Sequence, residues 1–275
     1  MRVDLNGPPQ TMLATLYAKA LDADLPNPIL GDRYAKDIVD RIDYDWTKTA
    51  IAARNSPSVT TRTAHFDAWA RQFLGVHSNA VVLHVGCGLD ARYFRLQPSP
   101  QVEWYDIDYP DVAELRTRLY PAADQYHVVA ASVTEPAWLA EIPADRPALF
   151  LGEGLTMYLT KDDGLALLRR VVERCPSGEL QFDAFNRFAI RTQWINPVVR
   201  RSGSTLCWGI DGPGDILEAV PGTRLVSWVR WFESDTFQRL PRAHQVMGRV
   251  MSLVSGVANM AQYHRYAFGP ARGKG

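Results

Sequence analysis

The chain has 275 residues, with 30 Lys and Arg and 30 Asp and Glu, so its formal net charge is zero. Hydrophobic residues make up 47% and charged residues 22%, shares that fit a globular protein and exclude a disordered one. Zero net charge argues against a general nucleic-acid binder, because phosphate binding depends on an excess of Lys and Arg.

The three cysteines, Cys87, Cys175 and Cys207, form no C-x-x-C pair. We therefore expect neither a disulfide framework nor a structural zinc site, and we expect reduced thiols in the cytoplasm. The six histidines form no H-x-x-H or H-E-x-x-H pattern, so no metal site is expected. We also expect no signal peptide and no membrane association, because no apolar run approaches the roughly 18 residues that cross a bilayer.

Short helices broken by prolines are predicted for the first 60 or so residues. Residues 12–21 and 32–42 have helical apolar spacing, and Asp32 is a candidate N-cap. A third helix is predicted at residues 61–74, with Gly75 as its C-terminal stop.

From residue 80 onwards, short apolar runs alternate with helical stretches. Five runs predict buried parallel strands, at residues 80–85, 102–107, 126–131, 148–151 and 180–185. Two alternating runs at 225–231 and 262–268 predict two final strands, with a helical segment at 240–257 between them. The pattern indicates an α/β fold with a seven-stranded, mostly parallel sheet and helices on both faces. A helical segment at 187–201 lies where such folds often insert a lid.

A glycine loop follows the first strand, as Gly86-Cys87-Gly88-Leu89-Asp90-Ala91. Its G-x-G-x-x-A spacing is one form of the dinucleotide-binding loop. The next strand ends with Asp106-Ile107-Asp108, twenty residues after Gly88, where an acid hydrogen-bonds a ribose. We favour Asp108 because it lies nearer the carboxyl end of the strand. The loop predicts an adenosine-containing ligand; a tight turn that only packs helix on strand is the alternative.

NAD(P) and S-adenosylmethionine (SAM) both contain adenosine. Three features favour SAM. About 80 residues of largely helical chain precede the loop, the last two strands suit a sheet with an antiparallel final strand, and no second nucleotide half is evident. An NAD(P)-dependent oxidoreductase stays open as an alternative.

Five stretches occur in a specific order: TMLATLYAKAL, DYDW, VLHVGCGLDARYFR, WYDIDYPDV and LGEGLTMYL. Together they resemble the leucine carboxyl methyltransferase-like family of class I SAM-dependent methyltransferases, and in particular tetracenomycin-type polyketide O-methyltransferases. The resemblance covers residues 10 to 268. It implies a Rossmann-like methyltransferase sheet, with an N-terminal helical cap at 1–60, a methyltransferase domain at 61–275 and a lid insertion at about 186–215, all in one structural unit.

The resemblance also implies roles for single residues. Gly86 and Gly88 lie beside the methionyl part of SAM, and Asp108 holds the ribose hydroxyls. Arg62 matches an arginine that binds the SAM carboxylate, a task that suits a bidentate guanidinium. Glu153 matches an acid near the methionyl amine.

Three further positions match the cofactor site of the family. Ser132 and Val133 follow the third strand, where the adenine lies, although many relatives have an Asp there. Lys19 matches a basic residue of the cap that meets the SAM carboxylate.

Each assignment has a structural alternative. Arg62 pairs with Asp67 in one alternative, and Glu153 caps the following helix in another. Asp90 either braces the loop or touches SAM, and Cys87 is expected to be a small buried filler.

Methyl transfer from a sulfonium is an in-line displacement for which the protein supplies positioning and electrostatics. A carboxylate acceptor is already ionised at neutral pH, whereas a phenol, with a pKa of about 10, benefits from a general base. No His–Asp pair in the sequence indicates such a base, which favours a carboxylate. Candidate acceptor contacts are Tyr17 in the cap, Arg191 and Trp194 in the lid, and Asn186 after the fifth strand.

The leading hypothesis is therefore an O-methyltransferase for a small acidic and aromatic molecule, methylating the carboxylate or phenolic hydroxyl of a polyketide or other aromatic secondary metabolite. A protein C-terminal carboxyl methyltransferase and a SAM-binding protein with a non-methylating role stay open. No nucleic-acid partner is expected.

Overall fold

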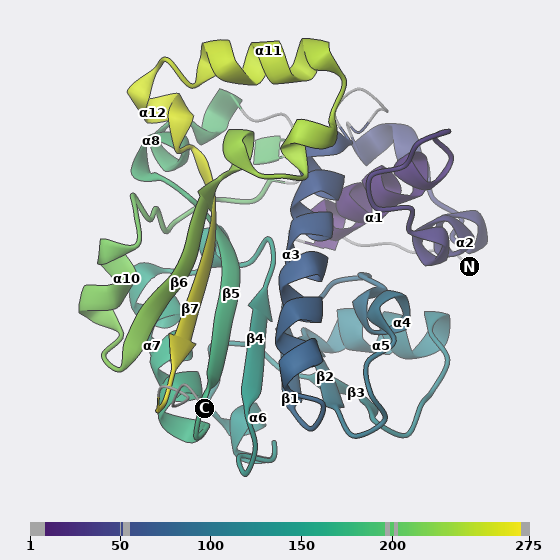
Figure 1. Cartoon of the computed structure of the whole chain (residues 1–275). Coiled ribbons are helices and arrows are strands. Elements are labelled where there is room, and N and C mark those ends of the chain that lie inside the picture. The colour runs from purple at the N-terminus through teal and green to yellow at the C-terminus, as the bar shows by residue number, and fades with distance from the viewer. Residues whose placement is uncertain (1–8, 50, 52–55, 196–198, 201–202, 271–275) are drawn as a thin grey trace.

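The computed structural model describes residues 9–49, 51, 56–195, 199–200 and 203–270 (Figure 1). Seven strands form one sheet in the order β3-β2-β1-β4-β5-β7-β6. The strands are β1 (Val81–Val85), β2 (Glu103–Asp108), β3 (Tyr126–Ala130), β4 (Ala148–Gly152), β5 (Gly178–Phe185), β6 (Thr223–Arg230) and β7 (Ala261–Phe268). Neighbouring strands from β3 to β5 are parallel, and β7 is antiparallel to both β5 and β6. All seven predicted strands and the mostly parallel sheet are thus confirmed.

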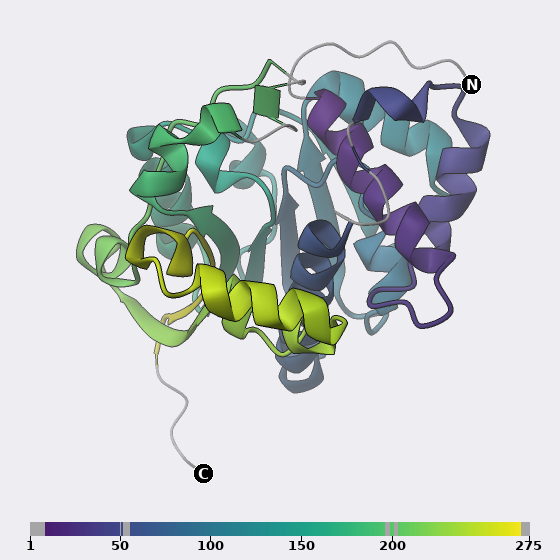
Figure 2. The same cartoon turned by 90° about the horizontal axis from the view of Figure 1, so that it is seen from above.

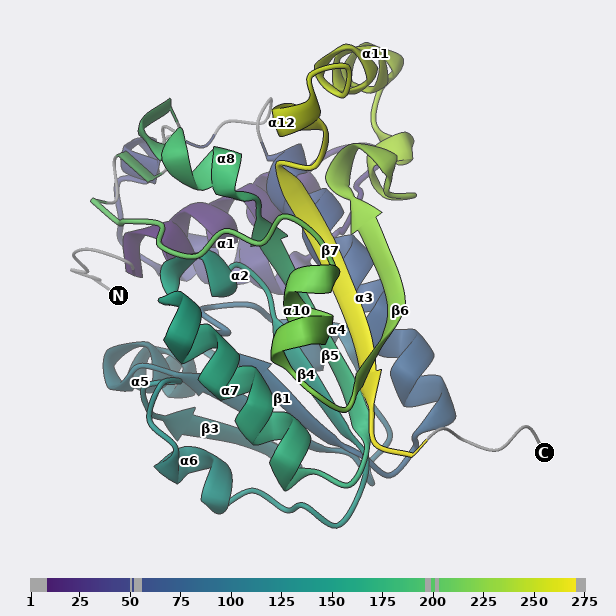
Figure 3. The same cartoon turned by 90° about the vertical axis from the view of Figure 1, so that its left-hand side faces the viewer.

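Helices cover both faces of the sheet (Figure 3). One face packs against α6 (Ala137–Ala140), α7 (Lys161–Arg174) and α10 (Gly214–Ala219). The other face packs against α3 (Pro57–Val76) and α4 (Arg92–Leu96). Because both faces are covered, every residue of β1 and β4 is buried, which explains their continuous apolar sequences.

Two N-terminal helices form the cap. The helices α1 (Pro9–Ala23) and α2 (Arg33–Arg41) share a hydrophobic cluster with α5 (Pro110–Leu119). The predicted N-cap is confirmed, since the Asp32 carboxylate accepts a hydrogen bond from Ala35 N at 3.1 Å. The predicted domain boundary at residue 60 falls inside the first turn of α3, and the division into cap and methyltransferase domain stays a prediction.

The prediction that Gly75 ends the third helix is wrong. The helix α3 continues to Val76, and its end is marked by His77, whose backbone N–H donates to Phe73 O. Gly75 is not among the glycines with positive φ, so it lacks the left-handed conformation that would make it a stop.

Further helices lie at the carboxyl edge of the sheet (Figure 2). α8 (Arg187–Arg191) and α12 (Ser255–Ala258) lie to one side of this edge and the cap to the other, while α11 (Arg242–Met251) lies above β6 and β7. The predicted segment 240–257 is therefore two helices. Short 3-10 turns in the described residues lie at Trp46–Thr49, Thr156–Tyr158, Gln193–Ile195, Trp231–Glu233 and Phe237–Arg239.

The predicted helix at 187–201 begins as α8 but is interrupted after Arg191. Part of the predicted lid, residues 196–198 and 201–202, lies outside the described residues. In the part of the chain that the structure describes, no helix has both the length and the hydropathy to cross a bilayer.

Candidate functional site

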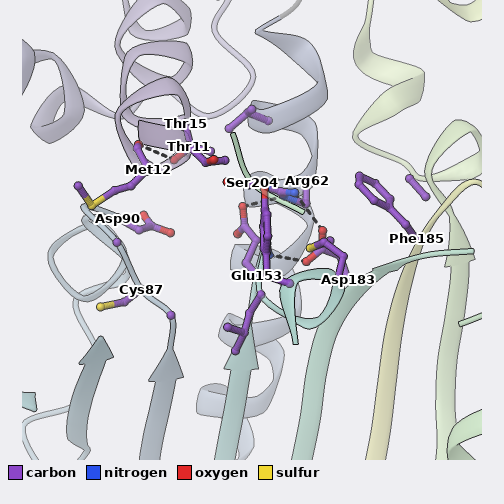
Figure 4. A pocket seen from close by; sticks show the side chains of 18 of the residues that line it. Thr11, Met12, Thr15, Arg62, Cys87, Asp90, Glu153, Asp183, Phe185 and Ser204 are labelled. Atoms are coloured by element: carbon purple, nitrogen blue, oxygen red, sulfur yellow. Dashed lines mark hydrogen bonds and ion pairs between the residues drawn. The ribbon is translucent and has the colours of Figure 1, made fainter. Parts of the chain in front are cut away.

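A cavity of about 570 Å³ lies at the carboxyl ends of the parallel strands, where ligands bind in open α/β sheets (Figure 4). Its walls come from α1, α3, the loop after β1, and the ends of β2, β4 and β5. Seven of the eight predicted cofactor residues line it: Lys19, Arg62, Gly86, Gly88, Asp108, Val133 and Glu153.

The glycine loop is tightly packed between the cap and the turn after β4. Gly86 and Gly88 have φ values of 64° and 52°, a left-handed conformation that favours glycine. A Cβ on Gly88 would lie 2.9 Å from the Met12 side chain, and one on Gly86 would lie 3.0 Å from Leu155. Glycine is therefore required for both the turn and the close approach, which leaves backbone atoms at the cavity wall.

Asp108 and Asp106 lie on the same side of β2 but have different surroundings. Asp108 lines the cavity, and its carboxylate accepts hydrogen bonds from Gly88 N at 2.7 Å and Tyr109 N at 2.8 Å. Burial raises the pKa of Asp108. Asp106 is fully buried and bonds Arg116. Of the two carboxylates, Asp108 is the one that lines the cavity, and its contact with a ribose stays a prediction.

Arg62 is fixed by two acids. Its Nε donates to Glu153 Oε1 at 3.0 Å, and its Nη1 donates to Asp183 Oδ2 at 3.0 Å. The alternative pairing with Asp67 is wrong, because Asp67 binds two arginines of α4 instead. Among the described residues the Nη2 of Arg62 has no hydrogen-bond partner, so this nitrogen remains available to a ligand carboxylate.

Glu153 follows β4 and is held as an anion. It accepts hydrogen bonds from Thr63 Oγ1 at 2.7 Å, from Arg62 and from Arg92. Burial opposes ionisation, but Arg92 and Arg62 lower the pKa of Glu153 to about 2. Glu153 does not cap the following helix, since the N-cap of α7 is Thr160.

Asp183 of β5 was missed by the sequence analysis. It lines the cavity, is 3% exposed, binds Arg62, and accepts a hydrogen bond from Gly154 N at 2.6 Å. Burial and, more weakly, the charge of Glu153 raise its pKa. A carboxylate inside the apolar run LQFDAF was the available signal, because buried acids need partners.

The cap reaches the cavity through Lys19. Its Nζ lies 3.2 Å from Asp90 Oδ2, and both side chains are buried. Asp90 also pairs with Arg95 at 3.0 Å. Burial opposes ionisation of Asp90, but Arg95 and Lys19 hold its pKa well below the usual range. Asp90 thus braces the loop against the cap while it also lines the cavity.

Other predicted residues lie elsewhere. Ser132 is not on the cavity wall and its hydroxyl bonds Thr134 Oγ1 at 2.8 Å. None of the four candidate acceptor contacts lines the cavity either. Tyr17 stacks on Trp46, Asn186 caps α8 and bonds Gly256 O, and Arg191 and Trp194 are exposed. Contact of these four side chains with the acceptor stays a prediction.

The side of the cavity away from the glycine loop is mostly apolar, and the sequence analysis did not identify its residues. They are Met157, Phe185, Val199, Trp231, Phe232, Met251, Met260 and Ala261. Cys87 lines the loop side, and burial raises its pKa, so it is a neutral thiol as expected for a filler. Among the described residues, no group of three or more His, Cys, Asp and Glu side chains is arranged to hold a metal ion.

Comparison with known proteins agrees with this geometry. The leucine carboxyl methyltransferase family model matches residues 11–172. The chain is 46% identical to the tetracenomycin polyketide synthesis O-methyltransferase TcmP of Streptomyces glaucescens, over 81% of this chain and 82% of that protein. It is 34% identical to the S-adenosyl-L-methionine-dependent methyltransferase dpfgK of Gibberella zeae, with the same coverage.

Solved structures show the same fold at low sequence identity. A putative methyltransferase from Thermobifida fusca superposes with a TM-score of 0.59 and 15% identity, and the match covers 92% of this chain and 94% of that one. A duf574 family protein from Streptomyces avermitilis gives the same TM-score and identity, with coverage of 92% and 97%. The chain therefore belongs to the leucine carboxyl methyltransferase family and is an enzyme that uses SAM as the methyl donor.

Proposed function

We propose that this methyltransferase acts on the carboxylate of a polyketide or other aromatic secondary metabolite. The observation that carries this proposal is the division of the cavity into a charged side and an apolar side. An aromatic body fits among Phe185, Trp231 and the methionines, which adapt to irregular shapes.

The charged side fits SAM. The glycine loop brings backbone atoms to the cavity wall, Asp108 lines the cavity and can accept ribose hydroxyls, and the Nη2 of Arg62 has no hydrogen-bond partner among the described residues. We assign Arg62 and Lys19 to the methionyl carboxylate, Glu153 to the ammonium and Val133 to the adenine. When bound, SAM supplies a methyl group on a sulfonium, and transfer to an oxygen anion leaves S-adenosylhomocysteine.

A carboxylate is favoured over a phenol because the described residues that line the cavity include no free imidazole. Among the described lining residues the one histidine is His84, whose Nδ1 lies 2.7 Å from Asp106. A carboxylate needs no base, since it is ionised at neutral pH. We also place the enzyme in the cytoplasm, because all three cysteines are free and Cys207 is exposed.

The test uses three probes: 2-naphthoic acid, 2-naphthol and 3-hydroxy-2-naphthoic acid, each with SAM labelled in the methyl group. We expect transfer to both acids and none to 2-naphthol. Mild alkali should release the label as methanol, because esters hydrolyse and aryl ethers do not. An alkali-stable product from 2-naphthol would assign a phenolic acceptor instead. No transfer to any probe by protein that binds SAM would contradict an aromatic acceptor.

A further inference from the structure

The buried hydroxyl of Tyr263 lacks a hydrogen-bond partner of normal geometry in the part of the chain that the structure describes. The residue lies on β7, lines the cavity and is 1% exposed. Buried polar groups are almost always paired, so an unpaired one points to a role. Thr61 is close enough to interact weakly with this hydroxyl, but it donates its own proton to Pro57 O and already accepts from Trp231 Nε1, so it can act towards Tyr263 only as an acceptor.

The strand register places Tyr263 beside residues from both sides of the cavity. Tyr263 pairs directly with Asp183, and Ala261 pairs with Phe185, which lies two residues nearer the carboxyl end of β5. Residues two apart on a strand share a face, and all four of these residues line the cavity. A ligand whose apolar body lies on Phe185 and Ala261 therefore has Tyr263 and Asp183 as its next neighbours along the two strands.

The aromatic ring of Tyr263 is held in place by its packing. Its centroid lies 4.7 Å from that of His65 and 5.4 Å from that of Phe66, both on α3. The charged groups that act on its hydroxyl are Arg62, Asp183 and Glu153. Asp183 is already bound by Arg62 and Gly154, so neither of its oxygens needs Tyr263 as a donor.

We infer that Tyr263 is the acceptor-positioning residue, whose hydroxyl donates a hydrogen bond to the carboxylate oxygen that is not methylated. This inference rests on the proposed function and narrows it. Burial keeps the pKa of Tyr263 well above its ordinary value, so the phenol stays protonated and is a donor rather than a base. Such a donor favours an acceptor that arrives as an anion.

The experiment compares Tyr263→Phe with Tyr266→Phe on the same strand. Tyr266 belongs to the hydrophobic cluster on the other face of the sheet, and its hydroxyl bonds His264 Nδ1 at 2.8 Å. Calorimetry of protein saturated with S-adenosylhomocysteine measures binding of 2-naphthoic acid and of methyl 2-naphthoate. We expect Tyr263→Phe to bind the acid roughly tenfold or more weakly, the scale of a hydrogen bond to a charged group, and the ester unchanged.

Two further readouts separate positioning from structure. SAM affinity should be unchanged in Tyr263→Phe, and its unfolding midpoint should not fall, whereas Tyr266→Phe should keep the acid affinity and lose stability. Unchanged acid affinity, weaker SAM binding or a lower midpoint in Tyr263→Phe would each overturn the inference. If Tyr263→Phe gives one of these contrary results but the wild type binds and methylates the acid, only the inference about Tyr263 fails and the proposed function stands. If the wild type methylates only 2-naphthol, both the inference and the proposed function fail.

Discussion

Asp108 and Asp106 show how two residues of one type, two positions apart, come to do different work. Asp106 accepts hydrogen bonds from Trp104 and Tyr126 as well as from Arg116, so its carboxylate oxygens are occupied by buried groups of the protein. Within the described residues, Asp108 has only backbone donors, one from the glycine loop and one from Tyr109. A carboxylate offers about four acceptor positions, so Asp108 retains capacity for a ligand.

Replacing Asp108 should therefore weaken cofactor binding directly. We expect Asp108→Ala to bind SAM about 1.5–3 kcal/mol more weakly, the scale of a hydrogen bond to a charged group. Because burial raises the pKa of Asp108, wild-type SAM affinity should also fall on acidification, as the carboxylate takes up a proton. Calorimetric titration with SAM measures both effects.

The matched control is Asp108→Asn, which keeps an oxygen for the Gly88 N–H but removes the charge. It should retain part of the affinity that Asp108→Ala loses. Unchanged SAM affinity in a folded Asp108→Ala protein would show that the ribose is held elsewhere.

Single residues were predictable where a local motif marked them. The glycine loop follows β1, and the acid twenty residues after Gly88 ends β2, so a fixed sequence distance marked both before the fold was known. Tyr263 had no such mark, because it lies eighty residues after Asp183 and meets it only through the β5–β7 register. In an alternating strand it looked like any inward-facing aromatic residue.

Several elements are joined by one buried group of charges. Asp67 of α3 accepts from Arg92 at 2.8 Å and Arg95 at 2.6 Å, both on α4. Arg95 also donates to Asp32 at the start of α2 at 2.6 Å. Because Asp90 of the glycine loop pairs with Arg95 as well, the cap, α3, α4 and the loop are held in one arrangement. The position of the cap over the glycine loop therefore depends on these ion pairs.

Within the N-terminal helical cap, we expect substitution of Asp32 to have the largest effect on stability, because Asp32 is the N-cap residue of α2 and also binds Arg95. We expect Asp32→Ala to lower the free energy of unfolding by about 3 kcal/mol, since it breaks a buried ion pair and removes a cap. Asp32→Asn should cost about 1 kcal/mol less, because asparagine also caps helices. Urea unfolding at pH 7 measures the difference. Equal losses in the two variants would mean that the N-cap hydrogen bond of α2 contributes no stability.

Helix positions followed from apolar spacing only where that spacing marked a buried face. It located α1 and α3, whose apolar residues pack against neighbouring elements. It failed to divide α11 from α12, because Val246 and Val250 of α11 are 56% and 60% exposed. An apolar pattern that faces outwards does not report where a helix packs or ends.

At the scale of the whole molecule, two buried neutral histidines make the stability of the fold depend on pH, although the formal net charge is zero. His65 packs between Trp69 and Tyr263, and burial lowers its pKa to about 4. His264 stacks on Phe182, and burial lowers its pKa to about 3. Each histidine regains a pKa of about 6.5 in the unfolded chain, so the unfolded state binds more protons than the native state below that pH.

Stability should therefore decline as the pH falls from 7 towards 5, by about 1.4 kcal/mol per pH unit for each buried histidine below its unfolded pKa. The buried carboxylates with lowered pKa, such as Glu153, lose their contribution only at lower pH. Replacing one histidine isolates its share: between pH 7 and 5, His65→Phe should lose about 2 kcal/mol less than the wild type. Urea unfolding at pH 7, 6 and 5 tests this, with His264→Phe as a second variant. If the free energy of unfolding falls equally with pH in the wild type and both variants, groups other than these histidines cause the acid sensitivity.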